Sequence, residues 1–187
     1  PLEKLVTMAW SSLPAQHLIS RFMPKIFQSG SWTNSMTNIP NPNRNKIIEI
    51  AHNKINENII YLDTETTGID REAEIVEIAI IDQTGDCLFQ SLVRPKNPIP
   101  PDATHIHGIT NEMVSESLAW PILWQSVRPH LIGKLIAGYN IDFDRRLIQQ
   151  SMEKYNLPLQ QNFSLFDIMQ LLSAYRGEWG SRRQQVR

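Results

Sequence analysis

The spacing of apolar residues changes along this chain, and each change predicts a different element. In residues 46–57 the apolar side chains recur on one helical face, which predicts a helix that leads into the folded domain. They are Ile47, Ile48, Ala51 and Ile55. The apolar run that follows, residues 58–63, predicts a buried strand that ends at Asp63.

Two further strands are expected before the pattern becomes helical again. Residues 74–82 are rich in β-branched side chains and predict a second strand. The turn sequence QTGD separates it from residues 87–95, which predict a third strand that closes a hairpin. Residues 95–101, PKNPIPP, are expected to form an extended loop, because proline cannot donate to the centre of a sheet.

Helices and strands alternate in the second half of the chain. Residues 111–132 predict one or two helices, with Pro121 near a start and Pro129 near an end. The remaining expected elements are a strand at 134–140, a helix at 142–155, a strand at 163–167 and a last helix from 168. Consecutive strands followed by alternation predict an α/β fold, in which helices flank a mixed sheet.

The first 45 residues differ in character from the rest. An apolar stripe with helical spacing runs through residues 18–27, and Pro24 within it favours a break or kink. This segment is either a helix that packs on the domain or a docking helix; too few basic residues line it for a membrane-surface helix. Residues 31–45 have the composition of a linker. We therefore divide the chain into an N-terminal segment of residues 1–45 and a folded domain of residues 46–187.

Composition narrows the classes of function. The chain has 187 residues, 41% hydrophobic and 20% charged, which suits a single globular domain with an appendage. The net charge of -1 provides no general attraction to nucleic acid, so such a role needs a local site and metal ions. Cys87 is the single cysteine, which excludes disulfides and fits a reducing, cytoplasmic setting. No apolar run approaches the roughly 20 residues of a membrane span.

Two carboxylates follow the first expected strand, in the sequence YLDTETTGID. Side chains two apart on a strand share a face, so Asp63 and Glu65 are expected together, with Thr64 pointing away. Paired carboxylates without a neighbouring base repel each other unless a cation lies between them. Their hard oxygen ligands suit Mg²⁺ or Mn²⁺. The alternative is a solvated turn that ends at Gly68 and is capped by a threonine.

A third carboxylate is expected nearby, in GYNIDFDRRLI. Asp142 and Asp144 lie at the start of a helix, where the helix dipole alone favours acids. Asp144 also follows the end of a strand, and sites collect at such ends in open α/β sheets. Three carboxylates from two strand ends fit a two-metal phosphodiester site. His107, in THIHGIT, is a solvated loop residue, a core residue or a substrate contact.

These segments, in this order, resemble the DEDD superfamily of 3'→5' exonucleases, and most closely its proofreading epsilon subunits and their stand-alone relatives. The motif DxETTG is matched by residues 63–68, HGIT by residues 107–110, and the Asn-x-x-Phe-Asp motif by residues 140–144. The resemblance covers about residues 58–176 and implies a ribonuclease H-like fold.

The resemblance also implies a mechanism and a set of residues. Two Mg²⁺ or Mn²⁺ ions are expected, with Asp63 bridging both, Glu65 placing the attacking water and Asp144 holding the second ion. The implied substrate is a single-stranded 3' end of DNA or RNA, and a polymerase or another replication protein is an implied partner. The expected contacts to the terminal nucleotide are Thr64, Thr66, His107, Asn140 and Phe143.

One part of the family pattern is missing. Its third motif, HxxxxD or YxxxD, supplies a general base and a fourth carboxylate, and no histidine or late tyrosine here has Asp at that spacing. Asp167 has no histidine before it and is expected to cap the last helix. We expect a chain cut at both ends and impaired as an enzyme.

Two rival hypotheses stay open. One is a non-catalytic binder of nucleic acid or nucleotides with a decayed site. The other is a polymerase-associated module that docks through residues 1–45.

Overall fold

The computed structural model describes residues 42–157 and 162–177. The apolar stripe expected to be helical in residues 18–27, most of the 31–45 linker and the tail after residue 177 lie outside these ranges. Within the described part, helices and strands follow one another largely as the apolar pattern predicts.

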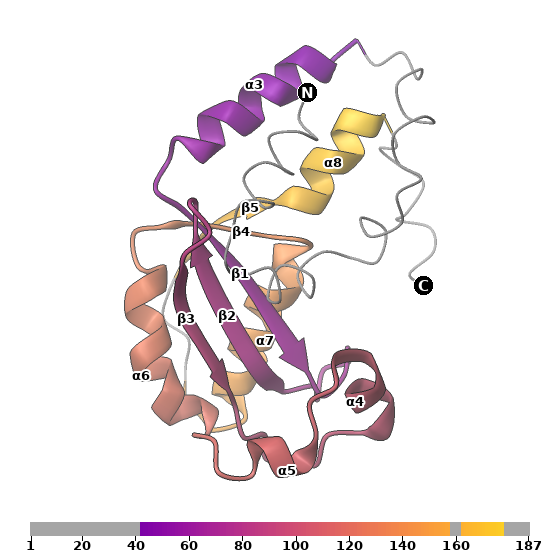
Figure 1. Cartoon of the computed structure of the whole chain (residues 1–187), viewed down its shortest axis with the longest axis vertical. Coiled ribbons are helices and arrows are strands. Elements are labelled where there is room, and N and C mark those ends of the chain that lie inside the picture. Colours follow the sequence, from indigo (N-terminus) through magenta and orange to yellow (C-terminus); the bar gives the residue numbers. More distant parts are fainter. Residues whose placement is uncertain (1–41, 158–161, 178–187) are drawn as a thin grey trace.

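A mixed sheet forms the centre of the fold (Figure 1). Among the described residues it has five strands in the order β3-β2-β1-β4-β5. The first three strands pair antiparallel, whereas β4 runs parallel to β1 and β5 runs parallel to β4. The strands are β1 (Ile59–Thr66), β2 (Ile75–Asp82), β3 (Cys87–Leu92), β4 (Leu135–Gly138) and β5 (Ser164–Asp167). The predicted mixed sheet is confirmed.

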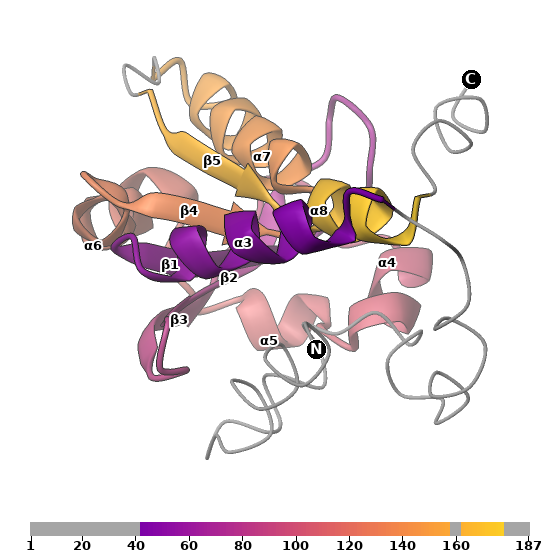
Figure 2. The ribbon, with the colours of Figure 1, turned by 90° about the horizontal axis from the view of Figure 1, so that it is seen from above.

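The helices lie around this sheet. Viewed from above in Figure 2, α3 lies beside α8, and the two helices are in contact. The short helices α4 and α5 lie together near the end of the sheet where β1 finishes (Figure 1). The helices are α3 (Arg44–Ile55), α4 (Pro101–His107), α5 (Asn111–Val114), α6 (Trp120–Leu131), α7 (Ile141–Glu153) and α8 (Ile168–Arg176). None of the helices in the described ranges is long and apolar enough to cross a membrane.

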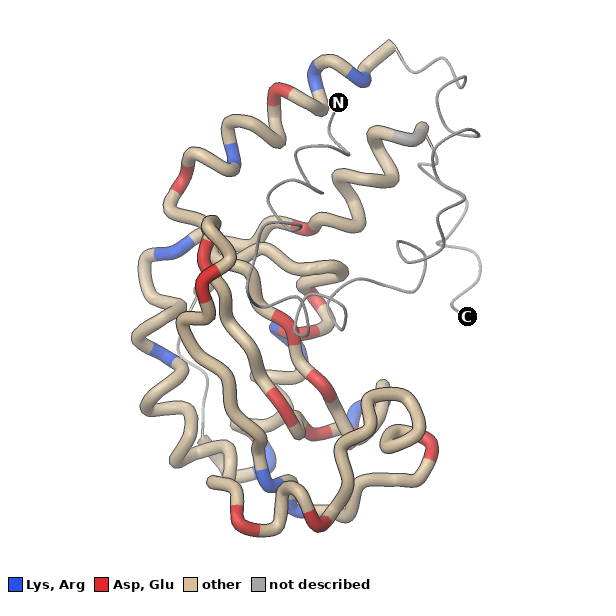
Figure 3. Tube along the Cα trace, viewed as in Figure 1, with Lys and Arg blue, Asp and Glu red and all other residues tan. Residues whose placement is uncertain are grey.

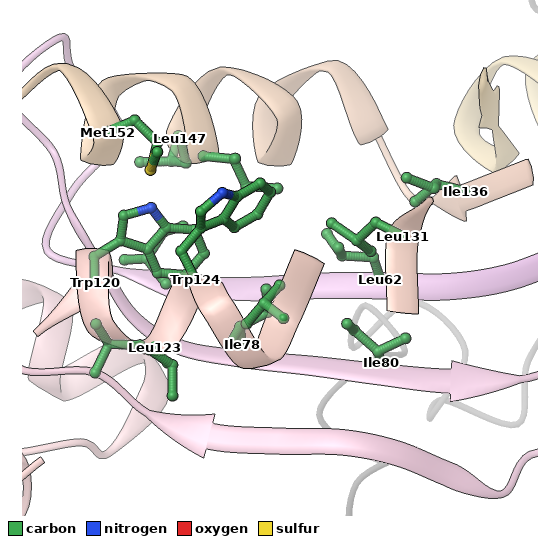
Figure 4. Close-up of a cluster of buried hydrophobic side chains, with 14 of the residues drawn as sticks. Leu62, Ile78, Ile80, Trp120, Leu123, Trp124, Leu131, Ile136, Leu147 and Met152 are labelled. Atoms are coloured by element: carbon green, nitrogen blue, oxygen red, sulfur yellow. The ribbon is translucent and has the colours of Figure 1, made fainter. Parts of the chain in front are cut away.

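The main core lies between one face of the sheet and helices α6 and α7. Side chains two apart on a strand point the same way, so β1 and β2 each contribute alternate apolar residues to this face. Figure 4 shows them packed against Trp120 and Trp124 of α6 and Leu147 of α7. The sheet residues of the cluster are Ile60, Leu62, Ile75, Ile78, Ile80 and Ile136. The apolar residues of α7 in this core hold the helix against the face of the sheet.

The prediction of an extended loop over residues 95–101 is wrong at its end, because Pro101 already belongs to a helix. Pro101 takes the first position of α4, where its missing N–H costs nothing and its fixed φ suits a helix. Gly108 ends the helix in the left-handed conformation, with φ of 77°. His107 is therefore the last residue of a helix, and the short α4 and α5 cover a second apolar cluster around Val76, Ile99 and Ile109.

Candidate active site

Strand β1 sorts the residues of the DxETTG motif onto two faces. The strand continues to Thr66, so Asp63 and Glu65 lie on one face while Thr64 turns to the other, as predicted. Thr64 is buried, whereas Asp63 and Glu65 are half-buried. The antiparallel register places Glu77 of β2 directly opposite Glu65. Acidic positions consequently gather on the neighbouring strands β1 and β2 (Figure 3).

Asp144 joins this strand through a buried hydrogen bond. It lies in the first turn of α7, and its side chain is only 3% exposed. The hydroxyl of Thr64 donates to Oδ1 of Asp144 over 2.7 Å. A buried carboxylate without a donor is costly, so this bond ties the start of α7 to β1. The Thr64 side chain, expected near the substrate, has this internal partner.

Two carboxyl groups of the site, Asp63 and Asp144, have a raised pKa. Burial raises the pKa of the Asp63 carboxyl well above its usual range, and nearby negative charges raise it further. In order of effect, these charges are Asp144, Glu65 and Glu77. Burial raises the pKa of Asp144 to about 7, against the opposing hydrogen bond from Thr64. The negative charge at this place is therefore incompletely compensated by the protein itself.

Glu77 is the member of this group that the sequence analysis missed. It lies among apolar residues in β2, and Gln90 of β3 donates to its Oε1 over 3.0 Å. A charged residue inside the run EIVEIAIID was a visible signal. Its position opposite Glu65 depends on the register between β1 and β2, and residue types alone did not fix that register.

The HGIT segment is fastened to the DxETTG segment through His107. This side chain is buried, with 9% exposed, and both ring nitrogens have partners in the protein. Nδ1 accepts from the Ile109 amide over 3.0 Å, so Nε2 carries the proton and donates to the Thr66 carbonyl over 3.2 Å. Of the three possibilities left open for His107, the burial of the residue fits that of a core residue. The Thr66 hydroxyl in turn donates to the Gly68 carbonyl over 2.6 Å.

The start of α7 is held by an unusual backbone conformation. Asn140, the residue before the helix, has φ of 64° and ψ of 48°, which is uncommon for any residue except glycine. Its amide donates to Oδ1 of Asp167, and its carbonyl accepts from the Phe143 amide over 2.8 Å. Phe143 is half-buried and packs on the main core, as its spacing predicted.

Asp167 is a helix cap, as predicted. It precedes α8, and its Oδ1 accepts from the amides of Met169 and Gln170. Because the same oxygen also accepts from the Asn140 amide over 3.2 Å, it links the start of α8 to the start of α7. An open pocket of about 380 Å³ lies beside it, lined in part by Ile141, Phe166 and Leu171.

The chemistry of these carboxylates fits hard divalent cations. Asp63, Glu65, Asp144 and Glu77 offer only oxygen donors, and a cation would relieve the repulsion that raises the pKa of Asp63. As the side chains stand, no three His, Cys, Asp or Glu residues in the described ranges gather closely enough to make a complete metal cluster. The donor set suits Mg²⁺ or Mn²⁺, and binding would require these side chains to draw together.

Comparison with known proteins identifies the class and then the family. The order of strands and the flanking helices define a ribonuclease H-like α/β fold. A family model described as Exonuclease (RNase T) matches residues 60–185. The chain belongs to this exonuclease family.

Individual relatives agree with that family. The chain is 42% identical over 127 residues to the uncharacterized exonuclease CP81 of Escherichia phage 186, covering 65% of each chain. It is 30% identical over 108 residues to the DNA polymerase III subunit epsilon of Pasteurella multocida, covering 52% of this chain and 43% of that one. The chain thus spans less than two thirds of the length of either relative.

The fold itself is shared with a solved exonuclease. Exonuclease I of Methylocaldum szegediense superposes with a TM-score of 0.53 at 24% identity, over 63% of this chain and 29% of that one. At 24% identity, this similarity shows a shared fold and nothing beyond it.

Proposed function

We propose that this chain carries the nuclease domain of a metal-dependent 3'→5' exonuclease, which hydrolyses phosphodiester bonds at the 3' ends of DNA or RNA. The observation that carries the proposal is the position of three acidic residues from two elements: Asp63 and Glu65 share a face of β1, and the hydroxyl of Thr64 between them binds Asp144 of α7. Membership of the exonuclease family supports it. A polymerase partner enters the proposal only through the likeness to an epsilon subunit.

Each acidic residue has a role in this proposal. Asp63 and Glu65 share a face of β1 and offer oxygens to the cations, and Glu77 adds negative charge opposite Glu65. Asp144 offers Oδ2, since its Oδ1 accepts the hydrogen bond from Thr64. These oxygens would hold two divalent ions, which would supply polarisation of the scissile phosphate and stabilisation of the leaving 3'-oxygen.

The terminal nucleotide is proposed to lie between the DxETTG and HGIT segments. The bond from His107 to the Thr66 carbonyl keeps these two segments together. The αL conformation of Asn140 sets the direction in which α7 leaves the sheet, and with it the position of Phe143. These residues orient the substrate in the proposal, together with the backbone near Thr64.

A low rate is part of the proposal. Hydrolysis also needs a group that takes the proton of the attacking water, and no His in this chain has Asp five positions later. The acidic residues and their cations then act without the partner that the family motif supplies.

The test compares two neighbouring aspartates of α7. Single strands labelled at the 3' or the 5' end are incubated with the chain in Mn²⁺, Mg²⁺ or EDTA. The wild type should release the 3' label first, in a metal-dependent reaction. Asp144→Asn should reduce the rate by about 100-fold or more, whereas Asp142→Asn, whose side chain is 65% exposed, should leave it unchanged.

Two results would contradict the proposal. Release of the 5' label first would refute the direction, and equal rates for the two variants would refute the role of Asp144. Binding of the strands in Mn²⁺ with no shortening at any enzyme concentration would favour the non-catalytic alternative.

A further inference from the structure

The loop of residues 68–73, which follows the DxETTG motif, is held by two side chains of α7. Arg146 donates from Nη1 to the Asp70 carbonyl and from Nη2 to the Ile69 carbonyl, each over 3.2 Å. Gln150, one turn further along, donates from Nε2 to the carbonyls of Asp70 and Ala73, also over 3.2 Å. The loop thus has four hydrogen bonds to a single helix face.

The two side chains also hold each other in place. Arg146 Nη1 donates to Oε1 of Gln150 over 2.7 Å. The Arg146 guanidinium lies over the Phe143 ring, with Cζ 5.0 Å from the ring centroid. A planar guanidinium that stacks on a ring and donates in two directions is more strictly oriented than an ammonium group. The arrangement is therefore specific to arginine.

This contact joins the two segments that carry the acidic residues. The loop begins three residues after Glu65, and Arg146 lies two residues after Asp144. The bond from Thr64 to Asp144 connects the same two segments within the core. The Arg146 contact is a second connection between them, and two separate connections restrict rotation of α7 relative to β1 more than one does.

We propose that Arg146 is a positioning residue of the nuclease site: by holding the 68–73 loop to α7, it fixes Asp63 and Glu65 relative to Asp144. The inference rests on the proposed function. Arg146 acts through the backbone of the loop and the placement of these acids, and it needs no contact with substrate.

Arg145 is a matched control on the same helix. Its side chain is 43% exposed, and it pairs with Asp142 over 3.6 Å on the surface. Exposed ion pairs of this kind contribute little to stability. Arg145→Gln and Arg146→Gln remove the same charge one residue apart, so a general electrostatic effect changes both alike. Arg146→Lys keeps the charge and loses the two-pronged contact.

The first experiment is hydrogen exchange on the metal-free full chain. The amides of Thr67 and Glu74 close the base of the loop, with bonds to the Glu74 carbonyl and to the Thr67 hydroxyl, each over 2.9 Å. In Arg146→Gln both should exchange about tenfold faster, while amides between β1 and β2 keep their rates. Arg145→Gln should match the wild type. Equal loop rates in the two variants would overturn the inference.

The second experiment measures Mn²⁺ affinity by calorimetry. Affinity should fall about tenfold in Arg146→Gln, fall less in Arg146→Lys, and stay unchanged in Arg145→Gln. If the wild type binds Mn²⁺ more tightly than Asp63→Ala but Arg146→Gln binds it equally well, the inference fails and the proposed function stands. If the wild type binds no more tightly than Asp63→Ala, the proposed function fails, and the inference fails with it.

Discussion

The two faces of β1 have opposite tasks. Ile60 and Leu62 point into the main core and are at most 2% exposed, while Asp63 and Glu65 lie on the other face with Glu77 beside them. Burial of the apolar face stabilises the folded state, whereas the other face concentrates negative charge that the protein incompletely compensates. Strict alternation along one strand thus separates the residues that stabilise the fold from those that we propose for chemistry.

The largest expected effect distinguishes the two faces by stability. Leu62→Ala should lower the free energy of unfolding by about 2–5 kcal/mol, because it leaves a cavity in a close-packed core. Glu65→Gln, three residues on and on the opposite face, should change it by less than about 1 kcal/mol. Urea unfolding of the two variants in EDTA measures both, and similar losses would show that the faces are not distinct.

Thr64 lies on the core face of β1 and supports the acidic group through its hydroxyl. Thr64→Val removes the hydroxyl that donates to Oδ1 of the buried Asp144, and should cost about 1–3 kcal/mol. Thr64→Ser keeps the hydroxyl and should recover most of that loss. Thermal unfolding at pH 8 compares them; an equally unstable serine variant would mean that the methyl group, not the hydroxyl, matters.

The raised pKa of Asp144 predicts a pH dependence in the absence of metal. Its folded pKa of about 7 exceeds the usual unfolded value near 3.9, so the folded state binds the proton more tightly. This contribution to stability is complete below about pH 4 and is lost as the pH rises through 7. Relative to Asp144→Asn, the wild type should lose about 2–3 kcal/mol between pH 5 and pH 8 in EDTA. A difference that stays constant with pH would contradict this account.

A smaller effect is expected at Glu77. Glu77→Gln removes one of the charges that raise the pKa of Asp63. The new amide keeps an Oε1 oxygen, so it can still accept the hydrogen bond from Gln90. The metal-free variant should gain up to about 1 kcal/mol at pH 8. Glu72→Gln, whose side chain is 85% exposed, is the control and should lack that gain. Thermal unfolding measures both variants.

Much of this organisation was predictable because it depends on local spacing. Alternation along β1 placed Asp63 and Glu65 on one face, helical spacing placed Phe143 toward the core, and the cap role of Asp167 followed from its position before a helix. The short motifs pointed to the exonuclease family, which the comparisons then established.

The missed features depend on contacts between distant residues. Glu77 faces Glu65 only because of one strand register, and Arg146 meets the 68–73 loop only because α7 crosses the sheet at one angle. The helix α4 was not predicted, because prolines usually interrupt helices, whereas Pro101 occupies the first position of this one. Periodicity carries no information on any of these.

The most direct test measures how Asp63→Asn changes the unfolding temperature with and without metal. We expect the change to have opposite signs in the two conditions. In EDTA at pH 8 the variant should unfold at a higher temperature than the wild type, because it removes a half-buried charge that lies among like charges. In millimolar Mn²⁺ the order should invert, since ligand binding stabilises only the protein that holds the ion. We therefore expect the unfolding temperatures of the two proteins to cross between EDTA and Mn²⁺. The same order with and without Mn²⁺ would contradict the claim that this face of β1 is built to hold cations.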